Sequence, residues 1–172
     1  MLAPVCQFLA AQGHEVSVVA RRSGGLAALA ASTRGEPGRI HPLQVDYRRE
    51  RAWRAELASA RAKRGPVVLV VAWIRSDAAG AVQVLAEQLA ADAVRCRYFD
   101  IRGSAVADPA TGGADSEQFL RRWPHLAYHR IVLGFKVERG GSRWLTNQEI
   151  AAGVIAAILN DVPETVVGLV RP

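Results

Sequence analysis

Long apolar runs are absent from this chain of 172 residues. The longest apolar stretch, residues 66–74, is far shorter than the roughly 20 residues that a membrane-spanning helix needs, so no transmembrane helix is predicted. The N-terminus has no basic segment, and Gln12 and His14 soon interrupt its apolar residues, which argues against a signal peptide. We therefore expect a cytoplasmic protein without a membrane partner.

Cysteine is equally scarce, with only Cys6 and Cys96 present. The two do not form a C-x-x-C motif, and both lie among apolar residues, a context typical of buried, reduced thiols. His125 and His129 are four residues apart, but neither a carboxylate nor a cysteine accompanies them and a strand is predicted there. The sequence therefore predicts no disulfide and no metal site.

Lysine is rare too, although the chain is basic, with a net charge of +6 and a pI near 10.1. A basic chain can bind nucleic acid because clustered cations replace the counterions around phosphates. Here the basic residues are almost all arginines, and they are spread from Arg21 to Arg171. Local groups at residues 48–54 and 61–64 fall on one predicted solvated helix. We therefore expect no nucleic-acid partner.

Half of the residues are hydrophobic and 22% are charged, which is typical of a folded globular protein. The length suits one domain, residues 1–172. Short β-branched or apolar runs predict strands at residues 15–20, 40–45, 67–74, 94–101, 128–138 and 165–170. Apolar residues at helical spacing predict helices that end at residue 12 and that cover residues 26–31, 50–62, 78–91 and 146–159.

Local signals support two of these helices. Gly13 stands where a helix C-terminal cap belongs, and Thr146 with Glu149 forms a capping box at the start of the last helix. Residues 107–116 form the one long predicted loop. Alternating strands and helices with short connections predict an α/β fold, a doubly wound and mostly parallel sheet of the Rossmann type.

Three features in this order resemble the short-chain dehydrogenase/reductase superfamily. They are the first helix running into A-A-Q-G-H-E-V-S-V-V-A-R-R, Asp46 at the end of the next strand, and the apolar strand at residues 67–74. Further on, Val132-Leu-Gly-Phe, Ser142-Arg-Trp-Leu-Thr-Asn-Gln-Glu-Ile and Gly153-Val154 resemble an atypical branch of that superfamily.

The resemblance implies a feature that this chain does not contain. In such relatives a first strand and a G-G-T-G-M-L type turn precede the first helix, and the glycines of the turn hold the pyrophosphate of a dinucleotide. Met1 and Leu2 would then be the last residues of that turn. We therefore expect a single NAD(P)-binding Rossmann-like domain whose N-terminal first strand is missing, unless the protein does without the turn.

The resemblance also implies a cofactor. Arg21 and Arg22 follow the strand at residues 15–20, where dinucleotide-binding domains contact the adenosine ribose. A guanidinium there pairs with the 2′-phosphate of NADP(H), whereas an acidic residue would bind the 2′-hydroxyl of NAD(H). NADP(H) is therefore the expected cofactor, with Ser23 as a further phosphate donor; alternatively, the arginines are merely solvated in a turn.

Two further pairs of residues match cofactor-contacting positions of the superfamily. Asp46 and Tyr47 resemble the pair that contacts adenine, although Asp46 could equally cap the helix that follows. Ala72 and Trp73 end the apolar strand where the backbone would approach the ribose of the cofactor, although Trp73 would also suit a core position. These four residues complete the predicted cofactor-binding set.

The superfamily's catalytic pair, a tyrosine with a lysine four residues later, is not found. The residues four beyond the three tyrosines are Arg51, Arg102 and Val132, and neither Lys63 nor Lys136 has the required tyrosine. We therefore leave the catalytic residues unassigned and note that Tyr128 and His129 could face the nicotinamide.

Two functions fit these features. The first is an NADP(H)-binding protein of the short-chain dehydrogenase/reductase type, a weak oxidoreductase at most because it lacks the standard catalytic pair. The alternative is a non-catalytic module that binds a nucleotide or acts in regulation. A helix as apolar as residues 150–159 would suit a homo-oligomer contact as well as a core.

Overall fold

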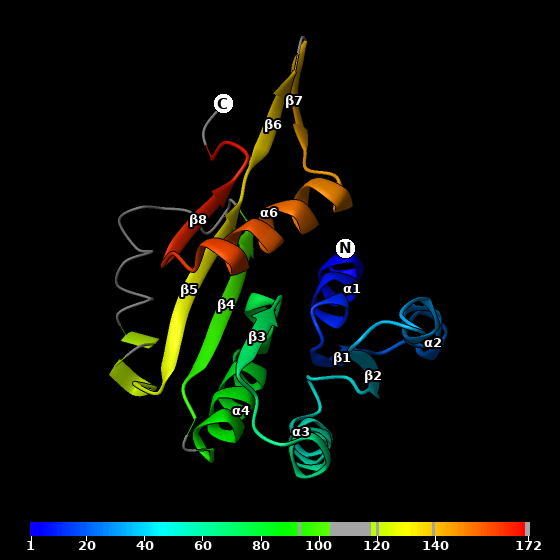
Figure 1. Cartoon of the computed structure of the whole chain (residues 1–172). Coiled ribbons are helices and arrows are strands. Elements are labelled where there is room, and N and C mark those ends of the chain that lie inside the picture. The colour runs from blue at the N-terminus through cyan, green and yellow to red at the C-terminus, as the bar shows by residue number, and fades with distance from the viewer. Residues whose placement is uncertain (93, 104–117, 120, 139, 171–172) are drawn as a thin grey trace. The chain divides into compact units, whose positions relative to one another are not determined.

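The computed structural model describes residues 1–92, 94–103, 118–119, 121–138 and 140–170 (Figure 1). The chain divides into two compact units, and each is described by itself. The N-terminal unit comprises residues 2–66 and 75–92, and the C-terminal unit comprises residue 1, residues 67–74 and the chain from residue 93 onward. The predicted loop at residues 107–116 lies outside the described residues.

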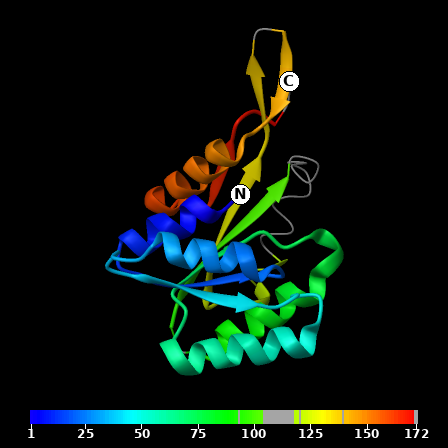
Figure 2. The same cartoon turned by 90° about the vertical axis from the view of Figure 1, so that its right-hand side faces the viewer.

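The N-terminal unit alternates helices and strands as predicted. Its elements in chain order are α1 (Ala3–Ala11), β1 (Glu15–Ala20), α2 (Ser23–Ser32), β2 (Arg39–Gln44), α3 (Glu50–Arg64), the 3-10 turn η1 (Ser76–Ala78) and α4 (Ala79–Ala90). Gly13 adopts a φ of 87°, a value that favours glycine, and so ends α1 where the sequence predicted. Strands β1 and β2 run parallel to each other (Figure 2). Ala20 lies opposite Gln44.

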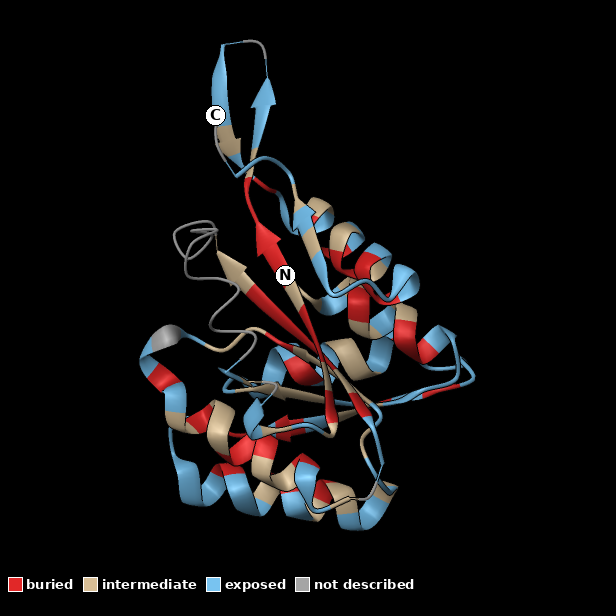
Figure 3. Ribbon diagram, turned by 90° about the vertical axis from the view of Figure 1, so that its left-hand side faces the viewer, coloured by how far each residue is buried: buried red, intermediate tan, exposed pale blue. Residues whose placement is uncertain are grey.

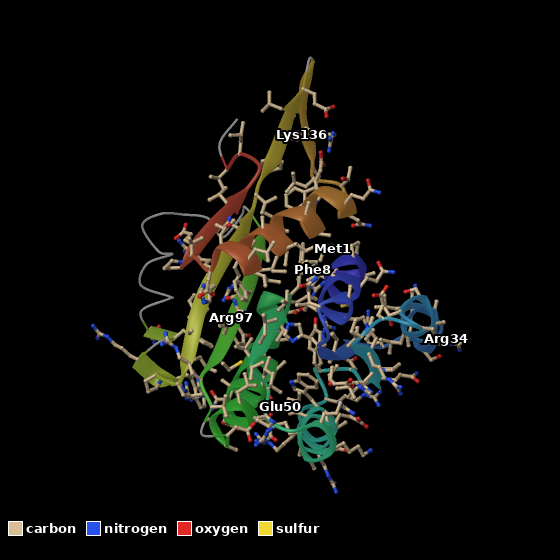
Figure 4. All side chains as sticks on the ribbon, viewed as in Figure 1. Met1, Phe8, Arg34, Glu50, Arg97 and Lys136 are labelled. Atoms are coloured by element: carbon tan, nitrogen blue, oxygen red, sulfur yellow. The ribbon has the colours of Figure 1, made fainter. Side chains whose placement is uncertain are left out.

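Helices α3 and α4 pack against each other through apolar and charged contacts. Trp53 is 4% exposed, and its indole N–H donates a hydrogen bond to the Ala81 carbonyl at 3.1 Å. At the other end of α3, the Arg61 guanidinium holds both oxygens of Asp92, at 2.8 and 2.6 Å. The helices also approach closely where Glu50 of α3, labelled in Figure 4, faces Gly80 of α4. A Cβ added to Gly80 would lie only 2.1 Å from the Glu50 carboxylate.

The C-terminal unit is built on a parallel sheet in the order β3-β4-β5-β8 (Figure 1). Its strands are β3 (Leu69–Ala72), β4 (Cys96–Gly103), β5 (Leu126–Leu133) and β8 (Glu164–Val167). The middle strands β4 and β5 hold the buried core of the unit, coloured red in Figure 3. The α/β class with parallel strands is confirmed, although the parallel strands described form two sheets, β1-β2 and β3-β4-β5-β8.

Helix α6 (Asn147–Asn160) begins at the predicted capping box. The Thr146 hydroxyl accepts the Glu149 N–H at 3.2 Å, and the Glu149 carboxylate accepts the Thr146 N–H at 2.8 Å. At the other end, Arg97 of β4 donates to the Ile158 carbonyl at 3.2 Å (Figure 4). None of the helices in the described ranges is long and apolar enough to cross a membrane.

The single strand predicted at residues 128–138 is wrong. The chain forms β5 up to Leu133 and then β6 (Phe135–Glu138), which pairs antiparallel with β7 (Gly141–Trp144), a strand that was not predicted. The break is at Gly134, where a Cβ would lie only 2.1 Å from the Leu169 carbonyl oxygen. Because only a glycine tolerates that approach, β5 ends there and β6 and β7 extend as a hairpin beyond it (Figure 1).

Candidate cofactor site

Arg21, Arg22 and Ser23 lie at the carboxyl end of β1, as predicted. All three are exposed, and neither guanidinium makes a hydrogen bond or ion pair with another residue in the described part of the chain. The backbone here is fixed by its neighbours, because Gln44 donates to the Arg21 carbonyl at 3.4 Å and Val45 donates to the Ala20 carbonyl at 3.2 Å. The two arginines are therefore uncommitted cations on an ordered turn.

The same turn leads into the N-terminus of α2. Arg22 is the N-cap residue of α2 and has an extended conformation. No side chain caps this helix, and the first turn of the helix carries no acidic residue. A Cβ at Gly24 or Gly25 would meet nothing within 4 Å, so the backbone of this first turn is open. Unpaired N–H groups at a helix start attract anions, and here they adjoin two arginines.

Asp46 and Tyr47 follow β2 at the same edge of the two-stranded sheet. Both are half-buried, and Asp46 Oδ1 accepts the Arg48 N–H at 3.1 Å. Asp46 thus orders the turn before α3, but the N-cap of that helix is Arg49, which has no side-chain cap. The carboxylate therefore does not cap the helix itself.

Further charges near Tyr47 were not predicted from the sequence. Asp77 accepts hydrogen bonds from Arg48 at 3.3 Å and from Arg75 at 3.0 Å. The hydrogen bond from Arg75, together with the charge of Arg48, lowers the pKa of Asp77 below its usual value. Arg48 lies 29 residues before Asp77, so no local pattern signalled that these two would meet.

Ala72 and Trp73 belong to the C-terminal unit. Ala72 is the last residue of β3, is 5% exposed and pairs in register with Asp100 of β4. Trp73 follows the strand and is half-buried. Both residues therefore lie at the carboxyl end of a parallel strand, the position expected of cofactor contacts in folds of this kind.

Comparison with known proteins identifies the fold. The sequence matches no protein-family model and no curated protein sequence. The structure, however, is similar to a double mutant of a short-chain dehydrogenase/reductase from Serratia marcescens, with a TM-score of 0.71 and 14% identity over 96% of this chain and 91% of that one. The chain has the short-chain dehydrogenase/reductase fold.

Two other solved structures with this fold carry a nicotinamide cofactor in their names. A metagenomic short-chain oxidoreductase in complex with NADP matches with a TM-score of 0.65 and 16% identity, over 96% of this chain and 90% of that one. An alcohol dehydrogenase from the archaeon Thermococcus sibiricus, complexed with 5-hydroxy-NADP, matches with a TM-score of 0.62 and 16% identity, over 96% and 89%.

Tyr128 and His129 are consecutive residues of β5, so their side chains lie on opposite faces of the sheet. The Tyr128 hydroxyl donates to Asp100 at 2.8 Å. The His129 ring stacks on Phe99 at 4.4 Å between centroids, and its Nδ1 lies 2.9 Å from the Val162 carbonyl. Because both side chains have partners in the middle of the sheet, neither is placed like a residue at a strand end.

The two cysteines are not suited to nucleophilic chemistry in this fold. Burial raises the pKa of Cys6 to about 11, which leaves its thiol protonated at neutral pH. Cys96 is 1% exposed. No disulfide joins the pair.

Proposed function

We propose that the protein binds NADP(H) as a short-chain dehydrogenase/reductase-like protein. Arg21 and Arg22 pair with the 2′-phosphate, and Ser23 supplies a further donor. Asp46 and Tyr47 contact the adenine, while Ala72 and Trp73 border the cofactor's ribose from the end of β3. The similar structures solved with NADP and 5-hydroxy-NADP support this choice of cofactor.

One observation carries the proposal. Arg21 and Arg22 are exposed and uncommitted at a strand end, directly before an uncapped helix N-terminus with an open first turn. A planar guanidinium can donate two hydrogen bonds to one phosphate. The N–H groups at a helix N-terminus add further donors, which also carry a partial positive charge. An acidic residue, the group that would select NAD(H), is absent from residues 21–25.

We further propose that any oxidoreductase activity is weak. A tyrosine and a lysine four residues apart on a helix are the usual proton-donating pair, and this sequence has none. The alternative is a non-catalytic module that binds a nucleotide or acts in regulation. The homo-oligomer expected from the apolar α6 stays a prediction, with which exposed Leu159 in that helix and exposed Val162 just after it agree.

The test is a titration of NADPH and of NADH, followed by nicotinamide fluorescence. Charge reversal in the double variant Arg21→Asp/Arg22→Asp should weaken NADPH binding by roughly 10- to 100-fold, because each charge-assisted hydrogen bond contributes about 1.5–3 kcal/mol. NADH binding should change far less. The titration is made on the chain and on a version extended upstream of Met1, because the resemblance places the phosphate-binding turn there.

The double variant Arg34→Asp/Arg39→Asp is the matched control. It makes the same change in net charge, but Arg34 follows α2 and Arg39 begins β2, at the amino end of that strand. The control should bind NADPH like the parent protein. Equal NADPH binding by the parent and by the Arg21/Arg22 variant would refute the assignment of these arginines. No NADPH binding by either form of the parent would favour the non-catalytic module that acts in regulation.

A further inference from the structure

A buried polar cluster lies on one face of β4 and β5. Asp100 is only 7% exposed, and its Oδ2 accepts two hydrogen bonds, from the Tyr128 hydroxyl at 2.8 Å and from Arg102 Nε at 2.7 Å. Tyr98, Asp100 and Arg102 alternate along β4 and therefore share a face of the sheet. The register sets Tyr98 beside Tyr128, and their rings stack at 6.2 Å.

Stability alone does not account for this cluster. A buried ion pair costs so much desolvation that apolar residues of the same size are often as stabilising. The Tyr98 hydroxyl adds to the cost, because the residue is 1% exposed and its oxygen has no hydrogen-bond partner in the described structure. A buried polar group without a partner is rare in folded proteins and calls for an explanation.

Arg102 connects the cluster to the surface. It is the second-last residue of β4, and about a third of its side chain is exposed, 34% against 11% for Asp100. Its Nε is held by Asp100, while its two terminal NH2 groups make no hydrogen bond within the described residues. In open α/β sheets, ligands bind at the carboxyl ends of the strands, which is where this guanidinium lies.

The register relates Arg102 to the proposed cofactor contacts on β3. Ala72, the last residue of β3, pairs with Asp100, so Arg102 lies two residues further along the neighbouring strand. Both strands run in the same direction, and their carboxyl ends are therefore at one edge of the sheet. A ligand held by Arg102 would therefore lie at the carboxyl edge of the sheet, the edge at which β3 also ends.

We propose that Arg102 is a recognition group for a carboxylate on a small-molecule substrate. Asp100 and Tyr128 act as positioning residues, because they fix the Arg102 Nε and so set the direction of its terminal NH2 groups. As a statement about the substrate this inference rests on the proposed oxidoreductase function, whereas carboxylate binding itself does not depend on NADP(H).

The donor geometry selects the carboxylate. A guanidinium has five N–H donors in a plane, and once Nε is committed, the end-on pair of terminal NH2 groups remains. That pair presents two parallel donors, which match the two oxygens of a carboxylate. A neutral amide offers only one acceptor oxygen to the same pair and should bind more weakly.

Benzoate is the probe, and benzamide is its uncharged counterpart of nearly the same shape. In isothermal titration calorimetry the parent protein should bind benzoate at least 10-fold more tightly than benzamide, and inorganic phosphate is titrated in parallel. The variant Arg102→Gln should lose at least 10-fold in benzoate affinity. Arg102→Lys should lose most of it too, because an ammonium lacks the paired planar donors.

Two further variants separate folding from recognition. The double variant Asp100→Leu/Arg102→Met replaces the ion pair by apolar side chains, so it should keep the circular dichroism spectrum of the parent and still fail to bind benzoate. Asp100→Asn should bind benzoate several-fold more weakly, because Arg102 is then no longer held by a charge. Arg51→Gln, a change at an exposed arginine on α3, should bind like the parent.

The outcomes discriminate between the two proposals. The carboxylate inference is overturned if the parent does not bind benzoate, if it binds benzamide or phosphate as tightly, or if Arg102→Gln binds benzoate like the parent. NADPH affinity should be unchanged in Arg102→Gln, and a parallel loss of NADPH binding would assign Arg102 to the cofactor and overturn the inference. Benzoate binding without NADPH binding would instead refute the cofactor proposal alone.

Discussion

Arginine plays two different roles in this protein, and the difference lies in what holds each guanidinium. Arg21 and Arg22 are exposed and unpaired within the described structure, so they can turn toward a phosphate but must be ordered by it. Arg102 is already fixed by Asp100, so binding an anion costs it little further ordering. Residue identity alone does not distinguish the two cases, because the partner of Arg102 becomes visible only in the folded sheet.

Glycine shows a similar dependence on context, and it gives a prediction at the scale of one residue. A Cβ at Gly153 in α6 would lie 2.4 and 2.5 Å from the two methyl carbons of Val167 in β8. Valine is stiff at χ1 and cannot move its methyls aside easily. Gly153→Ala should therefore lower the free energy of unfolding by about 1–2 kcal/mol, although alanine favours helices.

Gly25→Ala in α2 is the matched control for urea unfolding monitored by circular dichroism. Nothing lies within 4 Å of a Cβ at Gly25, so this change should stabilise the protein by up to about 1 kcal/mol. A stabilising effect of Gly153→Ala would show that α6 and β8 can separate without cost, contrary to the packing described here.

At the scale of elements, the β6–β7 hairpin depends on one charge network at the start of α6. Arg143 donates to Glu138 at 2.8 Å and to Glu149 at 2.9 Å, and Lys136, labelled in Figure 4, donates to Glu149 at 2.8 Å. The ring of Phe135 also packs edge-on against Trp144. A two-stranded hairpin is marginal in water on its own, so these contacts hold it in place.

The variant Arg143→Gln removes one of the two cations that join the hairpin to Glu149 of α6. The amides of residues 135–138 and 140–144 should then exchange with deuterium several-fold faster in NMR spectra, because the hairpin opens locally more often. Amides of β4 should be unaffected. The partly exposed ion pairs should also weaken at about 1 M salt, so the parent should approach the variant's exchange rates there. Unchanged hairpin protection in Arg143→Gln would show that the ring contact and the Lys136–Glu149 ion pair are sufficient without Arg143.

Elements with local signals could be predicted from the sequence, and those determined by distant contacts could not. Gly13 and the pair Thr146 and Glu149 mark helix ends within a few residues, and the structure has both ends where expected. The break at Gly134 arises from the passing backbone of Leu169, which is 35 residues away. A glycine inside a predicted strand was the available signal for that break.

The candidate site divides in the same way. Arg21, Arg22, Asp46 and Ala72 were expected at strand ends because parallel strands place their carboxyl ends together, and the structure has them there. The role of each toward NADP(H) stays a prediction. Asp100 and Arg102 were missed, because a polar pair in an otherwise apolar strand is recognised only when Tyr128 is brought beside it.

At the scale of the whole molecule, basic residues outnumber acidic ones, 22 to 16. Most of the carboxylates that form ion pairs in the described structure have an arginine as their partner. Asp77, Asp92, Glu138 and Glu149 all have a pKa lowered mainly by hydrogen bonds from an arginine, Arg75 for the first, Arg61 for the second and Arg143 for the last two. In each case the folded state binds a proton less readily than the unfolded chain. The protein should therefore be sensitive to acid.

The sign of this effect fixes its pH window. A carboxylate whose pKa is lowered on folding contributes stability that is fully present above its unfolded pKa, near 4, and is lost as the pH falls through the folded value. The free energy of unfolding, from urea titrations at a series of pH values, should be flat with respect to these groups between about pH 7 and 5 and should fall below about pH 4.

Asp92→Asn tests whether the Arg61–Asp92 pair between α3 and α4 contributes to this fall. The variant should lose roughly 1 kcal/mol at pH 7, because the Arg61 fork is left without its carboxylate, and the difference from the parent should shrink as the pH falls below about 4. Glu36→Gln, at an exposed carboxylate without an ion pair in the described structure, should follow the parent throughout. A difference between Asp92→Asn and the parent that stays constant down to about pH 2 would mean that the pair acts through packing and not through charge, since protonation of Asp92 would then change nothing.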